Sequence, residues 1–274
     1  MLKPKSPIPE YPPASFVGVG DYRIAYFITG PTGGQPLVLC HGLAASGLQF
    51  VNDAAFFAEH GFRVIVPDLR GHGRSTGPVR HAQKDFTIDR LAKDMVAVLD
   101  DAGVGAADWV GNSLGGILAL SLMGTDPQRL KRFISFGTAY KLDVPKVVVP
   151  FMQLSHKIIG TEMMARLGAP MTCKGKNAQA IIYAMLRNLD ADAIMRIAKS
   201  VECYDLIANA RKFSNPILLL RGDQDRTVNL ALKPTLEAME PRDNFSILDI
   251  KNAGHCANLD QPNKVRRAVL EFLS

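Results

Sequence analysis

The chain has 274 residues, of which 47% are hydrophobic and 21% charged, values close to those of an average soluble globular protein. This length fits one large α/β domain, or a core with a sizeable insertion, and allows folding without disulfides or a structural metal. The formal charge of +6 is modest, and no run of lysines or arginines suggests a nucleic-acid partner.

Signals for targeting and for metal binding are missing from the sequence. The first thirteen residues are broken by prolines and have no apolar segment, so we expect no signal peptide. No apolar run approaches the roughly 18 residues of a membrane span, so we expect no stable membrane anchoring. Scattered cysteines without a CxxC pair favour a reducing, cytoplasmic compartment and no zinc site: these are Cys40, Cys173, Cys203 and Cys256.

Apolar runs typical of buried strands alternate with amphipathic stretches typical of helices. In chain order the pattern predicts strands at 16–19, 22–29, 37–40, 62–67, 107–110, 132–136, 216–221 and 245–250. Helices are predicted at 49–60, 87–102, 114–124, 230–239 and 263–273. This alternation favours a mostly parallel sheet with helices on both faces.

The alternation stops between residues 140 and 213, where no convincing strand is predicted. Amphipathic patterns there predict helices at 163–167, 178–189 and 193–207. We interpret the stretch as a helical lid over the carboxyl edge of the sheet. The expected organisation is therefore a core of residues 1–140 and 214–274, interrupted by a lid of residues 141–213.

A serine flanked by glycines gives the sharpest chemical signal. Ser113 lies in Gly111-Asn-Ser-Leu-Gly115, a G-x-S-x-G motif between a predicted strand and a predicted helix. Small residues two positions before and after the serine allow a tight strand-to-helix turn. The N-terminus of the following helix favours developing negative charge at that turn. The pattern predicts a nucleophilic serine.

A nucleophilic serine needs a base, and the base needs an orienting carboxylate. His255 follows the last predicted strand, and strand ends are where a parallel sheet places its ligands. The loop after the strand at 216–221 offers two acids, Asp223 and Asp225, and spacing alone does not choose between them. The remaining histidines lie in glycine-containing loops or in ordinary polar surroundings: His41, His60, His72, His81 and His156.

The order Ser, Asp, His resembles that of lidded α/β-hydrolases, and the resemblance covers nearly the whole chain. His41-Gly-Leu43 is similar to the family's loop after the third strand. Asp68-Leu-Arg-Gly-His-Gly-Arg-Ser75 is similar to its D-x-R-G-x-G-x-S loop. The resemblance implies the α/β-hydrolase fold, with a mostly parallel eight-stranded sheet, helices on both faces and a helical lid.

The family's pattern also implies the roles of individual residues. Ser113, His255 and Asp225 would form the catalytic triad, with Asp223 a structural neighbour. The backbone N–H groups of Leu43 and Leu114 would form the oxyanion hole. Ser113 would attack an acyl carbonyl, His255 would transfer the proton, and water would then release the acyl group.

Other polar residues in these loops have a structural interpretation. Arg70, His72 and Ser75 lie in a glycine-rich turn, so we expect them to stabilise neighbouring loops rather than bind substrate. Cys256, beside His255, is interpreted as a small buried residue rather than a reactive thiol.

The lid carries the remaining information about substrates. Eleven basic against six acidic residues give residues 141–213 a charge of +5, which indicates either a solvated surface or steering of anionic substrates such as carboxylated esters or acyl-CoA. Six of the ten methionines lie there, typical of an adaptable apolar pocket and equally of helix packing. The candidate substrate contacts are Asn112, Met152, Met163 and Arg187.

The sequence favours a serine hydrolase that cleaves ester or lactone bonds of small-to-medium, largely apolar molecules. A serine at the turn between strand and helix argues against dehalogenases and epoxide hydrolases of this fold, which place Asp at that position. Asn112-Ser113 and lid arginines such as Arg187 and Arg196 resemble the C–C bond hydrolases of meta-cleavage products, which usually carry Trp where this chain has Cys256. The base loop resembles that of oxoadipate enol-lactonases.

A ligand receptor built on a hydrolase fold is the alternative that is not an enzyme. The expected partner is a small molecule, with no nucleic acid. No metal or organic cofactor is expected, because no ligand cluster or phosphate-binding glycine loop is present. The pattern does not predict the oligomeric state.

Overall fold

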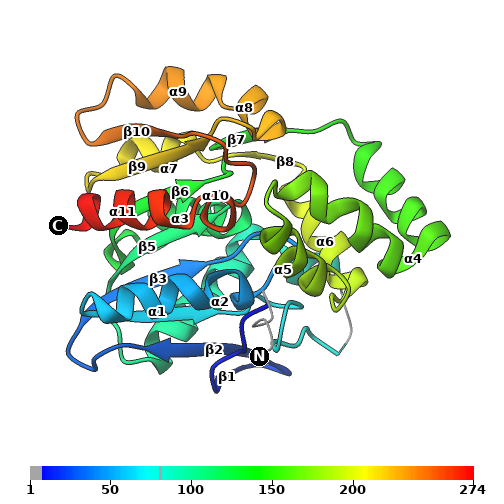
Figure 1. The fold of residues 1–274 in the computed structure, drawn as a ribbon, viewed down its shortest axis with the longest axis horizontal. Helices are drawn as coiled ribbons and strands as arrows, with labels where there is room; N and C mark the ends of the chain where they lie inside the picture. The colour runs from blue at the N-terminus through cyan, green and yellow to red at the C-terminus, as the bar shows by residue number, and fades with distance from the viewer. Residues whose placement is uncertain (1–7, 80–81) are drawn as a thin grey trace, which may run out of the picture.

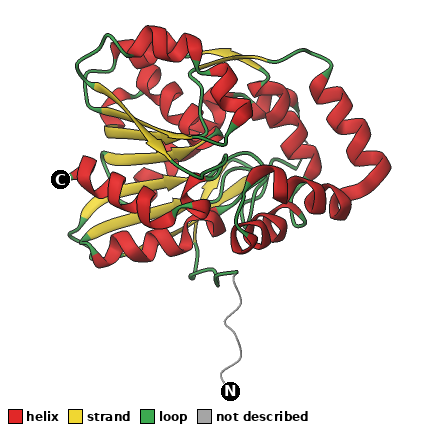
Figure 2. Ribbon diagram, turned by 45° about the horizontal axis from the view of Figure 1, so that its top comes forward, coloured by secondary structure: helices red, strands yellow, loops and turns green. Residues whose placement is uncertain are grey.

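The computed structural model describes residues 8–79 and 82–274, and it has an eight-stranded sheet at its centre (Figure 1). The strand order is β1-β2-β4-β3-β5-β6-β9-β10, and only β2 runs against the other strands. The predicted mostly parallel eight-stranded sheet, covered by helices on both faces, is confirmed (Figure 2). Residues 1–7, part of the segment judged not to be a signal peptide, and His81 lie outside the described residues.

The strands are β1 (Ser15–Val19), β2 (Tyr22–Thr29), β3 (Gln35–Cys40), β4 (Phe62–Pro67), β5 (Ala107–Asn112), β6 (Leu130–Phe136), β7 (Lys141–Asp143), β8 (Cys203–Asp205), β9 (Ile217–Gly222) and β10 (Phe245–Ile250). The α-helices are α1 (Val51–Glu59), α2 (Ile88–Asp101), α3 (Leu114–Thr125), α4 (Val148–Thr172), α5 (Lys176–Leu186), α6 (Ala191–Val201), α7 (Ile207–Lys212), α8 (Arg226–Ala231), α9 (Lys233–Met239), α10 (Ala257–Asp260) and α11 (Pro262–Leu273). Short 3₁₀ helices are η1 (Gly47–Phe50), η2 (Gln83–Phe86) and η3 (Pro127–Arg129). In the described ranges, no helix is long and apolar enough to cross a bilayer.

Neighbouring residues of the central strands pack into two separate apolar layers. On β3, Val38 belongs to the layer that contains α2 and α3, whereas Leu37 belongs to the layer that contains α1 and α11. Side chains alternate along a strand, so a strand covered on both faces reads as an unbroken apolar run. This burial explains why the strands of the core could be predicted from the sequence.

Helix α2 shows how local signals fixed the helix ends. The Thr87 hydroxyl accepts a hydrogen bond from the Arg90 N–H at 3.4 Å and caps the start of the helix. Gly103 follows the end of α2 with φ 65°, a conformation that costs glycine little. Leu91 and Met95, four residues apart, both face the core. The predicted helix at 87–102 is therefore confirmed.

The prediction of a single helix at 230–239 is wrong, because two helices cover this region. Helix α8 begins earlier, at Arg226, where the Asp225 carboxylate accepts a hydrogen bond from the Val228 N–H at 3.3 Å. Helix α9 begins at Lys233, with Pro234 in its first turn. Proline lacks an N–H group and clashes with the preceding turn, so it starts a new helix rather than continuing α8.

The prediction that residues 140–213 contain no strand is also wrong. Strands β7 and β8 pair antiparallel, and the Lys141 ammonium lies 2.8 Å from the Asp205 carboxylate across them. Helix α6 consequently ends at Val201 instead of reaching residue 207. Helix α4 is much longer than the predicted 163–167 and is interrupted at Gly160, where φ is 75°.

Helices α4, α5 and α6 gather at the end of the sheet opposite the C-terminus (Figure 1). Helix α6 rests on the loops of the core, since the Gln83 amide donates to the Arg196 carbonyl at 2.9 Å. Helix α7 instead packs on α3, and its Ala210 is buried in the apolar layer that contains α2 and α3. The chain therefore leaves the core at β7 and returns to it at β8.

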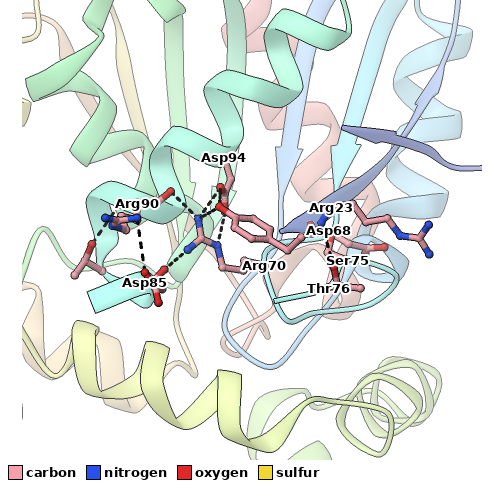
Figure 3. A network of polar contacts seen from close by, with 10 residues as sticks. Arg23, Asp68, Arg70, Ser75, Thr76, Asp85, Arg90 and Asp94 are labelled. Atoms are coloured by element: carbon pink, nitrogen blue, oxygen red, sulfur yellow. Dashed lines mark hydrogen bonds and ion pairs between the residues drawn. The ribbon is translucent and has the colours of Figure 1, made fainter. Parts of the chain in front are cut away.

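A buried ion pair joins the loop after β4 to helix α2 (Figure 3). Arg70, 2% exposed, donates two hydrogen bonds to the Asp94 carboxylate, at 2.7 and 2.8 Å, and further ones to the Asp85 carbonyl and the Tyr22 hydroxyl. The Tyr22 hydroxyl in turn donates to Asp94 at 2.8 Å. Burial raises the pKa of the Asp94 carboxyl although Arg70 opposes the shift.

We expect Asp94→Ala to lower the free energy of unfolding by about 3–5 kcal/mol, because it leaves the Arg70 guanidinium buried without a counter-charge. Urea denaturation would measure the loss. The matched control is Glu237→Ala, which removes the exposed pair between Glu237 and Lys233 and should change stability little. Equal effects of the two substitutions would contradict a special role for the buried pair.

Candidate active site

Ser113 lies on a sharp turn between β5 and α3. Its backbone has φ 49° and ψ −112°, a conformation rare for any residue other than glycine. A side chain at Gly115 would place its Cβ 2.1 Å from the Cys40 carbonyl oxygen, and one at Gly111 would lie 2.5 Å from the Gly116 nitrogen. The two glycines of the motif are therefore required by close backbone approach, which leaves the serine at the tip of the turn.

His255 and Asp225 meet at the ends of two neighbouring strands. The Asp225 Oδ2 lies 2.8 Å from the His255 Nδ1, although thirty residues separate them in the chain. Asp225 is buried, whereas the imidazole side chain is 30% exposed. Asp223 is directed elsewhere, since its carboxylate accepts a hydrogen bond from the Ala253 N–H at 3.3 Å. The structure thus pairs His255 with Asp225 and not with Asp223.

Ser113 and His255 line one cavity of about 220 Å³. Leu43 and Leu114 line it as well, and their backbone N–H groups donate no hydrogen bond to any described residue. The rest of the wall is largely apolar and includes Ile117, Ala139, Val228 and Ala231. Ser113, a histidine paired with Asp225 and two free N–H groups therefore share a small apolar space.

Asn112, a predicted substrate contact, instead ties two loops together. It is 1% exposed, and its amide donates to the His255 carbonyl at 3.0 Å and to the Phe136 carbonyl at 3.1 Å. Its oxygen accepts a hydrogen bond from the Gln49 amide at 3.0 Å. Every polar atom of the side chain is occupied, so Asn112 positions the histidine loop against the serine turn.

The other three predicted substrate contacts are not brought to this cavity. Met152 lies half-buried on α4, Met163 on the same helix is 46% exposed, and Arg187 is exposed after α5. None of the three lines the space at Ser113. The break at Gly160 and the packing of α4 on α5 set which helix faces turn outward, and neither follows from hydrophobic spacing.

The segment 141–213 supplies walls that the sequence did not single out. Leu142 on β7, Val144 just after it, Val201 at the end of α6 and Tyr204 on β8 line the cavity beside Ser113. Lys141-Leu-Asp-Val144 does alternate charged and apolar residues, as a half-buried strand would. An alternation over four residues is too short to be distinguished from chance. These residues are identified as cavity walls only from the structure, in which β7 pairs with β8.

Two buried histidines hold the loop that carries Leu43. The His72 Nε2 accepts a hydrogen bond from the Ala44 N–H at 3.1 Å, and the His41 Nε2 accepts one from the Leu69 N–H at 2.9 Å. Acting as acceptors requires both imidazoles to be neutral. Burial lowers the pKa of His41 to about 4 and, with the repulsion of His41, that of His72 to about 3.

Ser75 and Cys256 fulfil their structural interpretations. The Ser75 hydroxyl donates to the Asp68 carbonyl at 2.6 Å and accepts from the Ala25 N–H at 2.7 Å. Together with the buried Arg70 and His72, it stabilises loops rather than lining the cavity. Contact with Cys173 and burial raise the pKa of the Cys256 thiol, which disfavours the thiolate. No group of three metal-binding side chains occurs among the residues that the structure describes.

Comparisons with known proteins agree with this architecture. A family model described as alpha/beta hydrolase fold matches residues 35–160. The chain is 26% identical to a 2-hydroxy-6-oxononadienedioate/2-hydroxy-6-oxononatrienedioate hydrolase of Burkholderia vietnamiensis, over 92% of this chain and 91% of the relative. It is 25% identical to 3-oxoadipate enol-lactonase 2 of Acinetobacter baylyi, over 91% of this chain and 92% of the relative.

A solved structure is also similar. The enol-lactonase from Burkholderia xenovorans LB400 matches with a TM-score of 0.82 and 22% identity, covering 94% of this chain and 99% of that one. At this identity the likeness establishes the fold. The two relatives are named for different substrates, so the bond cleaved here has to be argued from the site itself.

The buried histidines predict a loss of stability in acid. Their folded pKa values lie below the ordinary 6.5, so the unfolded chain binds more protons and stability falls as the pH drops from about 6.5 towards 4. Each histidine should contribute about 1.4 kcal/mol per pH unit in that range. In urea denaturation from about pH 7 to pH 5, His72→Gln should therefore show a shallower dependence than the wild type. Replacing the exposed His60 by Gln is the control, and an unchanged slope in His72→Gln would contradict the account.

Proposed function

Since this chain belongs to the α/β-hydrolase fold superfamily, we propose that it is a serine hydrolase that cleaves ester or lactone bonds of small-to-medium, largely apolar substrates. One observation carries the proposal. Ser113 shares a small apolar cavity with His255, and Asp225 holds that histidine through its other nitrogen. This is the arrangement that acyl transfer through a serine requires.

The geometry supports the following roles. His255 receives the Ser113 proton as the hydroxyl oxygen attacks the acyl carbonyl, and returns a proton to the leaving alcohol oxygen when the ester bond breaks. Asp225 fixes the imidazole tautomer and stabilises the imidazolium. Water, deprotonated by His255, then attacks the acyl-enzyme, releasing the acid and restoring Ser113. Atoms balance as ester plus water giving acid plus alcohol.

The free N–H groups of Leu43 and Leu114 are assigned to the oxyanion. Leu114 opens helix α3, and the first N–H groups of a helix have no acceptor within it. Each such donor is typically worth about 3 kcal/mol of transition-state stabilisation. The hydrogen bond between Ala44 and His72 keeps the Leu43 loop in place before substrate arrives.

The size of the cavity supports compact acyl groups. Its volume of about 220 Å³ is below the about 300–1,000 Å³ of ordinary ligand pockets. Apolar walls favour a hydrocarbon chain over a charged one, because burying an unpaired charge is costly. We further propose that α4, α5 and α6 form a lid, whose two entry strands close one side of this cavity.

Two alternatives have distinct outcomes. A C–C bond hydrolase would turn over a vinylogous diketone much faster than esters of any chain length. A ligand receptor would be stabilised by small molecules without multiple turnover. A panel of esters, lactones and diketones, read with thermal stability, separates the three.

Intact-mass analysis after fluorophosphonate treatment tests the nucleophile without a known substrate. The wild type should carry one adduct and Ser113→Ala none. On an ester, Asp225→Asn should lower kcat by about 10⁴-fold because the histidine loses its orienting carboxylate. Asp223→Asn is the matched control and should lower it little. Equal losses in the two aspartate variants, or an adduct on Ser113→Ala, would overturn the assignment.

The cavity also predicts an acyl-chain preference. Ala231→Phe should fill part of the wall and reduce kcat/KM for a hexanoate ester at least about tenfold relative to the acetate ester. Leu230→Phe changes the neighbouring, 86% exposed residue and should leave the ratio as in the wild type. A ratio that is unaffected by Ala231→Phe would mean that the acyl group lies elsewhere.

A further inference from the structure

A second, larger cavity of about 580 Å³ also adjoins His255. It shares His255 and Thr227 with the cavity at Ser113, and Lys174 and Arg226 form part of its wall. We propose that this space receives the leaving group, and that Lys174 and Arg226 bind an anionic group carried on that alcohol. The inference rests on the proposed hydrolase function and specifies its substrate.

The placement of the leaving group follows from the proton transfer. The carbonyl must lie where Ser113 and the free N–H groups converge, which is the small apolar cavity. The departing oxygen must lie beside His255, because the imidazole protonates it. The larger cavity adjoins His255 without including Ser113, so it is the space available to the rest of the alcohol.

The acidic and basic side chains in the wall of the larger cavity differ in whether they already have a partner. Both acids have partners: Asp225 is paired with His255, and the Asp223 carboxylate accepts from the Ala253 N–H. The side chains of Lys174 and Arg226 make no hydrogen bond or ion pair with any described residue. Two unpartnered cations at the rim of one cavity favour a ligand that carries a carboxylate or a phosphate.

The backbone holds both cations beside the catalytic groups. Asp260 accepts hydrogen bonds from the Lys174 N–H at 2.7 Å and, through its second oxygen, from the Gly254 N–H at 2.9 Å. The Thr172 carbonyl accepts a hydrogen bond from the His255 N–H at 3.2 Å. Arg226 directly follows Asp225 in the chain. The positions of the two cations are thus fixed relative to the base by the lid on one side and by the core on the other.

The reaction expected is hydrolysis of an ester whose alcohol carries the anion. Water supplies the hydroxyl of the released acid and the proton of the released alcohol, and the anionic group is unchanged throughout. The apolar acyl group and the charged alcohol would occupy different cavities. One substrate can therefore carry both an apolar and an anionic group.

The decisive substrates are 4-carboxyphenyl butyrate and its uncharged analogue of equal shape, 4-carbamoylphenyl butyrate. The wild type should favour the carboxylate in kcat/KM by about tenfold or more, and added salt should reduce the preference. The butyrate ester of 4-hydroxyphenyl phosphate in a third arm separates a phosphate preference from a carboxylate one. In Lys174→Ala/Arg226→Ala the ratio should approach one, and Lys174→Arg alone should retain it.

The control is Arg166→Ala/Lys176→Ala, which removes two exposed cations of the lid that do not line the cavity. An equal loss of preference in this control would replace the local site by general steering from the lid and overturn the proposal. No preference in a wild type that hydrolyses both esters would overturn it too, while leaving the hydrolase function intact.

Calorimetry on Ser113→Ala separates the site from turnover. The product 4-hydroxybenzoate should bind this variant, and adding Lys174→Ala and Arg226→Ala should weaken binding about tenfold. Equal binding in both proteins would contradict the anion site even if the esters were never hydrolysed. Absence of both labelling and hydrolysis in the wild type would instead refute the proposed function.

Discussion

Ser113 has a strained backbone conformation that costs about 1–3 kcal/mol. The conformation persists because the packing of the surrounding chain holds the turn in place. The Ser113 N–H donates to the Phe136 carbonyl at 3.0 Å, fixing the turn to β6. Gly115 lies directly against the end of β3, so the start of α3 packs closely on the sheet. Backbone contacts with β6 and β3, rather than contacts of the serine side chain, therefore hold Ser113 at the tip of the turn.

The same principle extends to the loop opposite the serine. Ala44 also has a positive φ, 59°, and its N–H is satisfied by a buried imidazole instead of a backbone carbonyl. A protonated His72 could no longer accept that hydrogen bond. The low pKa of His72 thus belongs to the architecture of the site, and the buried Arg70 stabilises the segment on which His72 stands. Acid should accordingly loosen the loop that carries Leu43 as well as the fold.

Features of the fold could be predicted from the sequence where neighbouring residues determine them, and could not where contacts distant in the chain do. β4 has the predicted bounds, because a strand buried on both faces is marked by its own apolar residues. β10 also has the predicted bounds, although it is a partly buried strand at the edge of the sheet. The pairing of His255 with Asp225 was implied by family resemblance alone, since Asp223 lies only two residues away. Strands β7 and β8 form by pairing with each other, although they lie far apart in the chain. Each has only three residues, which is too few for β-strand propensity to reveal it in the sequence.

Three predicted substrate contacts do not line the cavity at Ser113, for a related reason. Composition drew attention to charged and flexible residues of the segment 141–213, but which of them face the cavity depends on the interruption of α4 at Gly160 and on contacts with α5. Met163 and Arg187 turn outward as a result. The small apolar walls at Leu142 and Tyr204 take their place, and neither residue type is unusual enough to be noticed in a sequence.

The loop that carries His255 and the end of α4 are joined by hydrogen bonds rather than by apolar packing alone. Asp260 bridges the Gly254 and Lys174 backbones, and Thr172 accepts a hydrogen bond from His255 itself. Any displacement of the end of α4 must therefore strain or break a hydrogen bond to His255. The segment that follows α4 restrains the loop of His255, because the two segments share the same anchoring carboxylate.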